Sequence, residues 1–194
     1  MDTQYLIPES MNQLTNNAVI PIRFVFLLWL VKIVEITLGI SFADFGIFPR
    51  TIWGLIGILT APLIHGSLMH LLSNTITLLV LGIVLFWLYP GAARTVFFYC
   101  YFITGALVWL FGRPSIHIGA SGLLYGIALF LMTIGLFRKD PKSIVVSILV
   151  VFFYSGILWG VLPIDPMISF ESHLMGALVG IGCASGFSRS RYLY

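Results

Sequence analysis

The chain contains six apolar runs, each close to the length that a helix needs to cross a bilayer. They cover residues 20–40, 66–88, 94–112, 118–137, 143–163 and 171–187. An α-helix rises about 1.5 Å per residue, so about 20 apolar residues cross a hydrocarbon core roughly 30 Å thick. Of the 194 residues, 59% are hydrophobic and 9% are charged, and the mean hydropathy is +1.05. Soluble domains carry about 25% charged residues. We therefore predict an all-α fold, a six-transmembrane-helix bundle of a polytopic membrane protein.

The six runs form one domain with a polar segment at each end. We assign residues 1–19 to a polar N-terminal segment, 20–187 to the six-span domain and 188–194 to a C-terminal tail. The connection 41–65 is too short and too interrupted to cross a bilayer. Its Trp53 favours a position at the membrane interface, where tryptophan is enriched.

Positive charge is unevenly divided between the two ends of the predicted bundle. One end carries Arg94, Arg138, Lys139, Lys142, Arg189 and Arg191, and the other carries Arg50 and Arg113. Because positively charged connections stay on the cytoplasmic side, both termini are expected in the cytoplasm of a protein of the plasma (inner) membrane. The net charge of +3 comes from few residues and does not indicate a nucleic-acid partner.

Four polar side chains lie at a similar depth in three predicted spans. His70 and Asn74 open the second span, Ser121 the fourth and His173 the sixth. Such groups cost free energy in lipid unless they meet one another. Together they provide a nucleophile, a base and oxyanion donors, which are the groups that acyl transfer requires.

Glycine spacing predicts which of these spans are neighbours. Gly119, Gly122 and Gly126 lie close to Ser121 in the sequence. Gly176 and Gly180 follow His173 and lie deeper in the same predicted span. Because small residues let helix backbones approach closely in lipid, we expect the fourth and sixth spans to pack together, with Ser121 facing His173. His70 and Asn74 are four residues apart and therefore share a helix face.

Three motifs together resemble the rhomboid intramembrane serine proteases. They are "HGSLMHLLSN", "GASGLLYG" and "HLMGALVG", in the family's order, and the resemblance covers residues 20–187. The first connection lacks the family's frequent Trp-Arg pair, because Gly54 follows Trp53. This departure indicates a divergent subgroup, and the resemblance is to the bacterial-type form with six spans.

The resemblance implies roles for the polar residues. Ser121 would be the nucleophile and His173 its general base, in a dyad without a carboxylate. His70 and Asn74 would hold the oxyanion together with the Ser121 backbone N–H. Tyr125 matches an aromatic residue that packs against the catalytic histidine, and His65 matches a histidine whose role is structural.

The resemblance also implies the substrates. These would be single-span or polytopic membrane proteins in the lipid bilayer, cut near the outer end of a transmembrane segment that has small or helix-breaking residues. No cofactor and no metal would be required.

Two other functions stay open at this point. A catalytically silent rhomboid-like protein would bind and route membrane clients, and loss of Ser121 or His173 would mark it. A transporter or metal permease could use the four histidines, but His65 and His70 are five residues apart and point in different directions on a helix. A further polar pair, Lys32 and Glu35 on the first span, is interpreted as a mutually neutralising structural pair.

Overall fold

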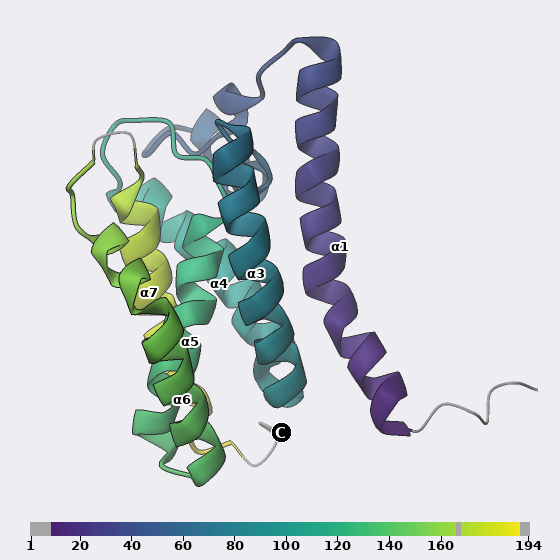
Figure 1. Ribbon diagram of the computed structural model, residues 1–194. Coiled ribbons are helices and arrows are strands. Elements are labelled where there is room, and N and C mark those ends of the chain that lie inside the picture. Colours follow the sequence, from purple (N-terminus) through teal and green to yellow (C-terminus); the bar gives the residue numbers. More distant parts are fainter. Residues whose placement is uncertain (1–8, 166–167, 191–194) are drawn as a thin grey trace, which may run out of the picture.

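The computed structural model describes residues 9–165 and 168–190, with side chains from residue 19 onward. Within these residues the longer elements are all helices (Figure 1), which confirms the all-α prediction. They are α1 (Glu9–Leu38), α2 (Ile56–Thr60), α3 (Leu68–Leu88), α4 (Pro90–Phe111), α5 (Ser121–Arg138), α6 (Pro141–Tyr154) and α7 (Phe170–Phe187).

Four stretches of the described chain are long and apolar enough to cross a membrane: α3, α4, α5 and Pro141–Val161. The other two predicted spans also fold as long helices, α1 and α7, but they are more polar. The described part of α1 carries Arg23, Lys32 and Glu35, and α7 begins with Glu171 and His173. The chain is thus a helical polytopic membrane protein, and its two less apolar helices carry charged or ionisable side chains, of which Glu35, Glu171 and His173 are buried.

Helix α5 occupies the centre of the bundle (Figure 1). Every residue from Ser121 to Gly135 is buried except Thr133. Its most extensive contact is with α7, and α6, α4 and α3 also pack against it. A central helix needs apolar side chains around its whole circumference, which is why its sequence lacks a polar face.

The contact between α5 and α7 brings two backbones together at glycines. A Cβ atom on Gly176 would collide with the carbonyl oxygen of Gly122, and one on Gly180 would collide with that of Gly126. The predicted packing of the fourth span against the sixth is therefore present. It depends on glycine because no other residue fits between the two backbones.

The fifth predicted span, residues 143–163, corresponds to the apolar stretch Pro141–Val161, and only its first part is an α-helix. The α-helix ends at Tyr154 and continues as a 3-10 helix, η5 (Ser155–Val161). Gly156 and Gly160 lower the helix propensity there. A Cβ on Gly160 would also collide with the Tyr125 hydroxyl, so this turn approaches α5 as closely as a glycine permits.

The first connection folds into short helical turns that are too short to cross a membrane. These are η2 (Ala43–Phe45), η3 (Trp53–Leu55), α2 and η4 (Ala61–Leu63). Ile47 and His117 exchange two backbone hydrogen bonds, of 3.0 and 2.9 Å. This bridge ties the first connection to the loop that leads into α5.

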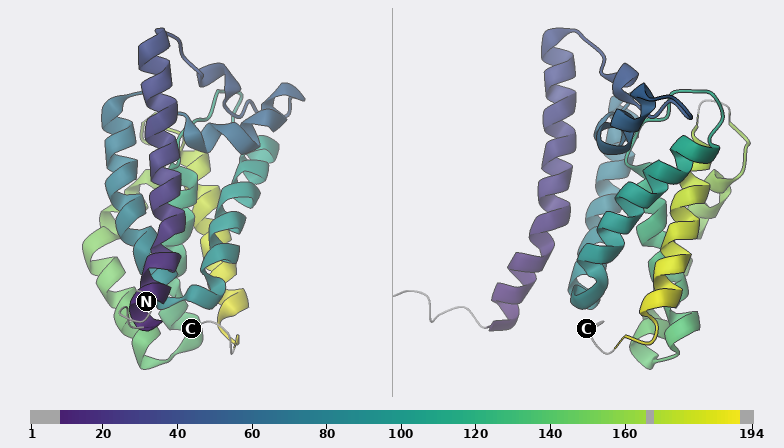
Figure 2. Two further views of the ribbon diagram at one scale, coloured as in Figure 1. Left: turned by 90° about the vertical axis from the view of Figure 1, so that its right-hand side faces the viewer. Right: turned by 180° about the vertical axis from the view of Figure 1, so that it is seen from behind.

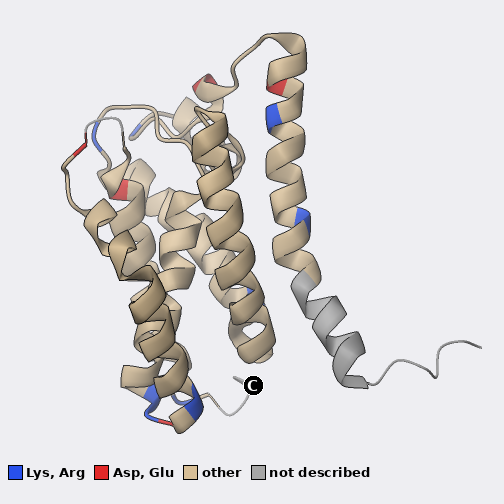
Figure 3. Ribbon diagram, viewed as in Figure 1, with Lys and Arg blue, Asp and Glu red and all other residues tan. Residues whose placement is uncertain are grey.

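The start of α1 and the end of α7 lie at the same end of the bundle (Figure 2). The basic turn between α5 and α6, with Arg138, Lys139 and Lys142, lies there as well (Figure 3). The predicted orientation requires both chain ends and the basic turn on one side of the membrane, and this arrangement meets that requirement. The assignment of this side to the cytoplasm stays a prediction.

The glycine contact predicts a position-specific effect of alanine on α7. Gly176→Ala should lower the free energy of unfolding by about 1–3 kcal/mol, because its methyl group forces the two backbones apart. Gly182→Ala is the matched control on the same helix, because nothing lies within 4 Å of its Cβ position. Thermal unfolding in detergent measures both variants, and equal Tm values for the two would contradict the contact.

Candidate active site

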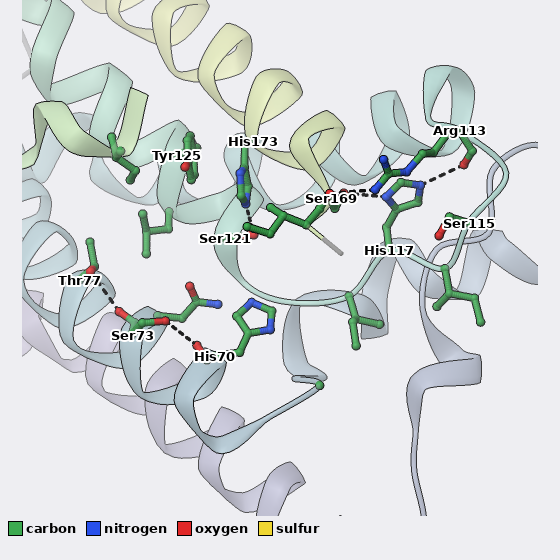
Figure 4. Close-up of a pocket in the computed structure, with 17 residues that line it drawn as sticks. His70, Ser73, Thr77, Arg113, Ser115, His117, Ser121, Tyr125, Ser169 and His173 are labelled. Atoms are coloured by element: carbon green, nitrogen blue, oxygen red, sulfur yellow. Dashed lines mark hydrogen bonds between the residues drawn. The ribbon is translucent and has the colours of Figure 1, made fainter. Parts of the chain in front are cut away.

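A cavity of about 650 Å³ opens where α3, α5 and α7 begin (Figure 4). Its walls include all four polar residues that the sequence placed at one depth: His70, Asn74, Ser121 and His173. Ser121 and His173 stand together, and His70 lies across the cavity from them.

Ser121 and His173 are joined by a hydrogen bond. The Ser121 Oγ lies 2.9 Å from His173 Nε2, and His173 Nδ1 lies 2.8 Å from the carbonyl oxygen of Gly160. A carbonyl oxygen only accepts, so Nδ1 carries the proton and Nε2 presents a lone pair to the serine hydroxyl. Both side chains are buried, with exposed fractions of 8% and 7%. A buried hydroxyl that donates to a neutral imidazole is the arrangement of a nucleophile with its base.

The carboxylate nearest to His173 in sequence has another partner. Glu171 Oε1 lies 3.4 Å from Arg113 Nε and accepts the Arg113 backbone N–H at 3.3 Å. The Nδ1–H of His173 is instead oriented by the neutral carbonyl of Gly160. The sequence did not predict Gly160 as the partner of His173, because the carbonyl of a glycine inside an expected helix would be bonded within that helix.

Tyr125 fixes the plane of the His173 ring. The two rings are parallel within 4°, with centroids 4.0 Å apart. The Cβ position of Gly160 is 3.1 Å from His173 Nδ1. Stacking on Tyr125 and the bond to Gly160 therefore hold the imidazole in both tilt and rotation.

Ser121 is the first residue of α5, and Ala120 before it caps the helix without a side-chain hydrogen bond. The first N–H groups of a helix have no intrahelical acceptor, and the helix dipole favours negative charge at this end. The backbone beside Ser121 is thus suited to stabilising an oxyanion.

His70 and Asn74 line the opposite wall, against the loop before Ser121. Gly119 has φ +107°, and a Cβ there would lie 2.7 Å from His70 Cε1. Both its conformation and its closeness to the imidazole require glycine. Asn74 Nδ2 lies 3.0 Å from His65 Nε2, a contact that the sequence did not predict.

The histidines do not gather as a metal site. His65 and His70 have ring centroids 5.0 Å apart, but His117 lies against Ser169 on another wall. Among the described residues there is no group of three or more His, Cys, Asp or Glu side chains that could hold a metal ion. The geometry therefore gives the permease interpretation no support.

A second hydroxyl–imidazole pair joins the same two segments as Ser121 and His173. His117 Nδ1 lies 2.6 Å from Ser169 Oγ, and His117 Nε2 lies 3.1 Å from the carbonyl of Arg113. Nε2 therefore donates and Nδ1 accepts from the serine. His117 is four residues before Ser121, and Ser169 is four residues before His173. The pair ties the loop that leads into α5 to the start of α7.

His117 also predicts how stability depends on pH. Burial lowers its pKa below the ordinary value of 6.5. The bond to the Arg113 carbonyl and the Glu171 carboxylate oppose this shift, and the Arg113 guanidinium adds to it. The folded protein thus holds His117 neutral while the unfolded chain takes up a proton first, so stability should fall as pH drops below about 6.5.

The test compares Tm between about pH 7 and pH 5 for the wild type and His117→Phe. The phenylalanine variant should be less stable at pH 7, where it lacks both hydrogen bonds, and its Tm should change less with pH. Other titrating groups act in both proteins, so the difference in slope reports His117. If Tm changed equally with pH in the two proteins, His117 would not be held neutral in the folded state.

Comparison with known proteins identifies the family. A family model described as the Rhomboid domain matches residues 49–190. Proteins named as uncharacterized from Mycobacterium tuberculosis and Mycobacterium bovis are each 37% identical over 174 residues, covering 84% of this chain and 72% of the relative. One from Mycobacterium leprae is 34% identical over 174 residues, with 84% and 68% covered. The three motifs and the cavity that they line fall within the matched region, and the chain belongs to the rhomboid family.

Proposed function

We propose that this protein is an intramembrane serine endopeptidase that cuts transmembrane segments of membrane proteins near their outer end. The observation that carries the proposal is the 2.9 Å hydrogen bond between Ser121 Oγ and His173 Nε2 in a cavity among membrane helices. Membership of the rhomboid family, which includes such proteases, supports it.

The reaction would proceed through an acyl-enzyme. Ser121 Oγ attacks the carbonyl carbon of the scissile peptide bond while its proton passes to His173 Nε2. The tetrahedral intermediate collapses as His173 returns that proton to the leaving amine. Water then attacks the ester and gives its proton to His173, and the acid is released as Ser121 regains a proton.

The surrounding groups would stabilise the charges that develop. The oxyanion would accept hydrogen bonds from His70, Asn74 and the Ser121 backbone N–H. The imidazolium would be stabilised by the Gly160 carbonyl, which lies 2.8 Å from Nδ1. A neutral carbonyl orients the ring without the free-energy cost of burying a carboxylate.

The substrate must expose its scissile carbonyl to reach Ser121. A peptide in an α-helix has this carbonyl bonded within the helix, so segments with small or helix-breaking residues near the outer end are favoured. Polar side chains, including Ser115, Arg113 and Ser169, line the same cavity and provide a path for water. Under this proposal residues 20–187 form the catalytic domain, and the polar ends 1–19 and 188–194 lie in the cytoplasm of the plasma (inner) membrane.

The dyad is tested with purified protein in liposomes and a single-span reporter that has small residues near its outer end. Ser121→Ala and His173→Ala should each reduce cleavage by at least roughly 10³-fold, and the double variant should be hardly worse, because the two residues act as a unit. Ser185→Ala is the control and should cleave at the wild-type rate, because Ser185 is exposed near the far end of α7 and does not line the cavity.

A serine-directed fluorophosphonate gives an independent measurement. It should label Ser121 in the wild type, and it should not label that position in His173→Ala. Near-wild-type cleavage by Ser121→Ala would overturn the proposal. A wild-type protein that binds the reporter and leaves it intact would point to the catalytically silent alternative.

Replacing an oxyanion donor should lower turnover without abolishing it. His70→Ala and Asn74→Ala should each reduce kcat by roughly 10²-fold, the lower end of the effect for such donors, because the other donors remain. Steady-state kinetics on the reporter separate kcat from KM. A rise in KM at constant kcat would instead assign these residues to substrate binding.

A further inference from the structure

Lys32 and Glu35 on α1 form an ion pair that also contacts the segment before α3. Lys32 Nζ lies 3.0 Å from Glu35 Oε2 and donates to the backbone carbonyl of His65 at 2.9 Å. Glu35 Oε1 accepts the backbone N–H of Phe42 at 2.7 Å. The ammonium and the carboxylate therefore each hold a backbone group of the first connection as well as each other.

An ion pair at this position is costly if it only fastens helices together. The side chains are 15% and 5% exposed, so both charges have lost most of their hydration. Apolar residues of the same volume would pack α1 with similar or greater stability. Intramembrane charged residues are usually retained for function, so their second contact points to what this pair does.

The second contact of Lys32, its hydrogen bond to the His65 backbone, connects the ion pair to the cavity wall that would bind the oxyanion. The His65 side chain is 1% exposed, and its Nε2 faces the Asn74 carboxamide at 3.0 Å and the Ala120 backbone N–H at 3.4 Å. A backbone N–H only donates, so Nε2 is the unprotonated nitrogen and accepts from both groups. One hydrogen of Asn74 Nδ2 is used in this bond, and Asn74 also lines the cavity.

We propose that Lys32 and Glu35 are positioning residues for the reaction, acting through His65. Lys32 fixes the His65 backbone, and the His65 ring in turn fixes the Asn74 carboxamide and Ala120, the residue directly before Ser121. The pair would thus set the geometry of two oxyanion donors, Asn74 and the Ser121 N–H, from a helix that does not line the cavity. This inference rests on the proposed protease function.

The test compares the pair with another polar contact of the same helix. In the double variant Lys32→Met/Glu35→Gln both charges and the bond to His65 are lost. Trp29→Phe is the matched control, because it removes the 3.0 Å bond from Trp29 Nε1 to Thr75 Oγ1, which also joins α1 to α3. Lys32→Arg keeps a cation and N–H donors.

Kinetics on the single-span reporter give the first readout. The double variant should lose roughly 10-fold in kcat at unchanged KM, less than the loss of a whole donor. Lys32→Arg should recover most of the rate, and Trp29→Phe should stay within about twofold of the wild type. Lys32→Gln is a milder change, and its kcat should lie between those of Lys32→Arg and the double variant. It replaces the double variant in the test if the double variant does not fold.

Amide hydrogen exchange over residues 118–124 gives the second readout and needs no activity. Exchange should be faster in the double variant than in Trp29→Phe at equal global stability, because Ala120 and Ser121 lose their support. If the wild type cleaves nothing, the proposed function fails, while exchange still decides whether the pair supports Ala120 and Ser121. Exchange and kcat equal to those of Trp29→Phe would show that the pair only anchors α1, and the inference would be overturned.

Discussion

The backbone contact between α5 and α7 is the constraint on which the candidate site depends. In a bilayer the helices gain little from hydrophobic burial against one another, so close packing of small residues has to hold them. Gly122 and Gly126 meet Gly176 and Gly180 without side chains between them. At that separation the short Ser121 side chain reaches His173 at 2.9 Å, whereas a methyl group in the contact would widen the gap.

Irregular backbone supplies the groups that orient the imidazoles. His173 donates to Gly160 in the 3-10 helix η5, and His117 donates to Arg113 in the loop before α5. In a regular α-helix these carbonyls would accept from their own helix. Each ring is thereby held as a neutral tautomer whose other nitrogen accepts from a serine. A buried carboxylate would do the same at a larger cost of desolvation.

The sequence predicted those features that helix periodicity controls. Depth along a helix placed His70, Asn74, Ser121 and His173 together, and four-residue spacing indicated the glycine contact. It did not predict Gly160 as the partner of His173, because that contact exists only where the expected helix over 143–163 changes to a 3-10 turn. The bond between His65 and Asn74 was missed for a similar reason, since His65 lies before α3 begins and follows no helical spacing.

Ser121 stands where two separately built halves of the cavity meet. Its side chain belongs to the half made by α5, α7 and η5, through the bond to His173. Its backbone follows Ala120, which is supported by His65 behind the half of the cavity that α3 lines. Under the proposed mechanism the base acts from the first half and the side-chain oxyanion donors act from the second. The scissile carbonyl must therefore bridge the two halves, and a fixed relation between them matters as much as the geometry within either.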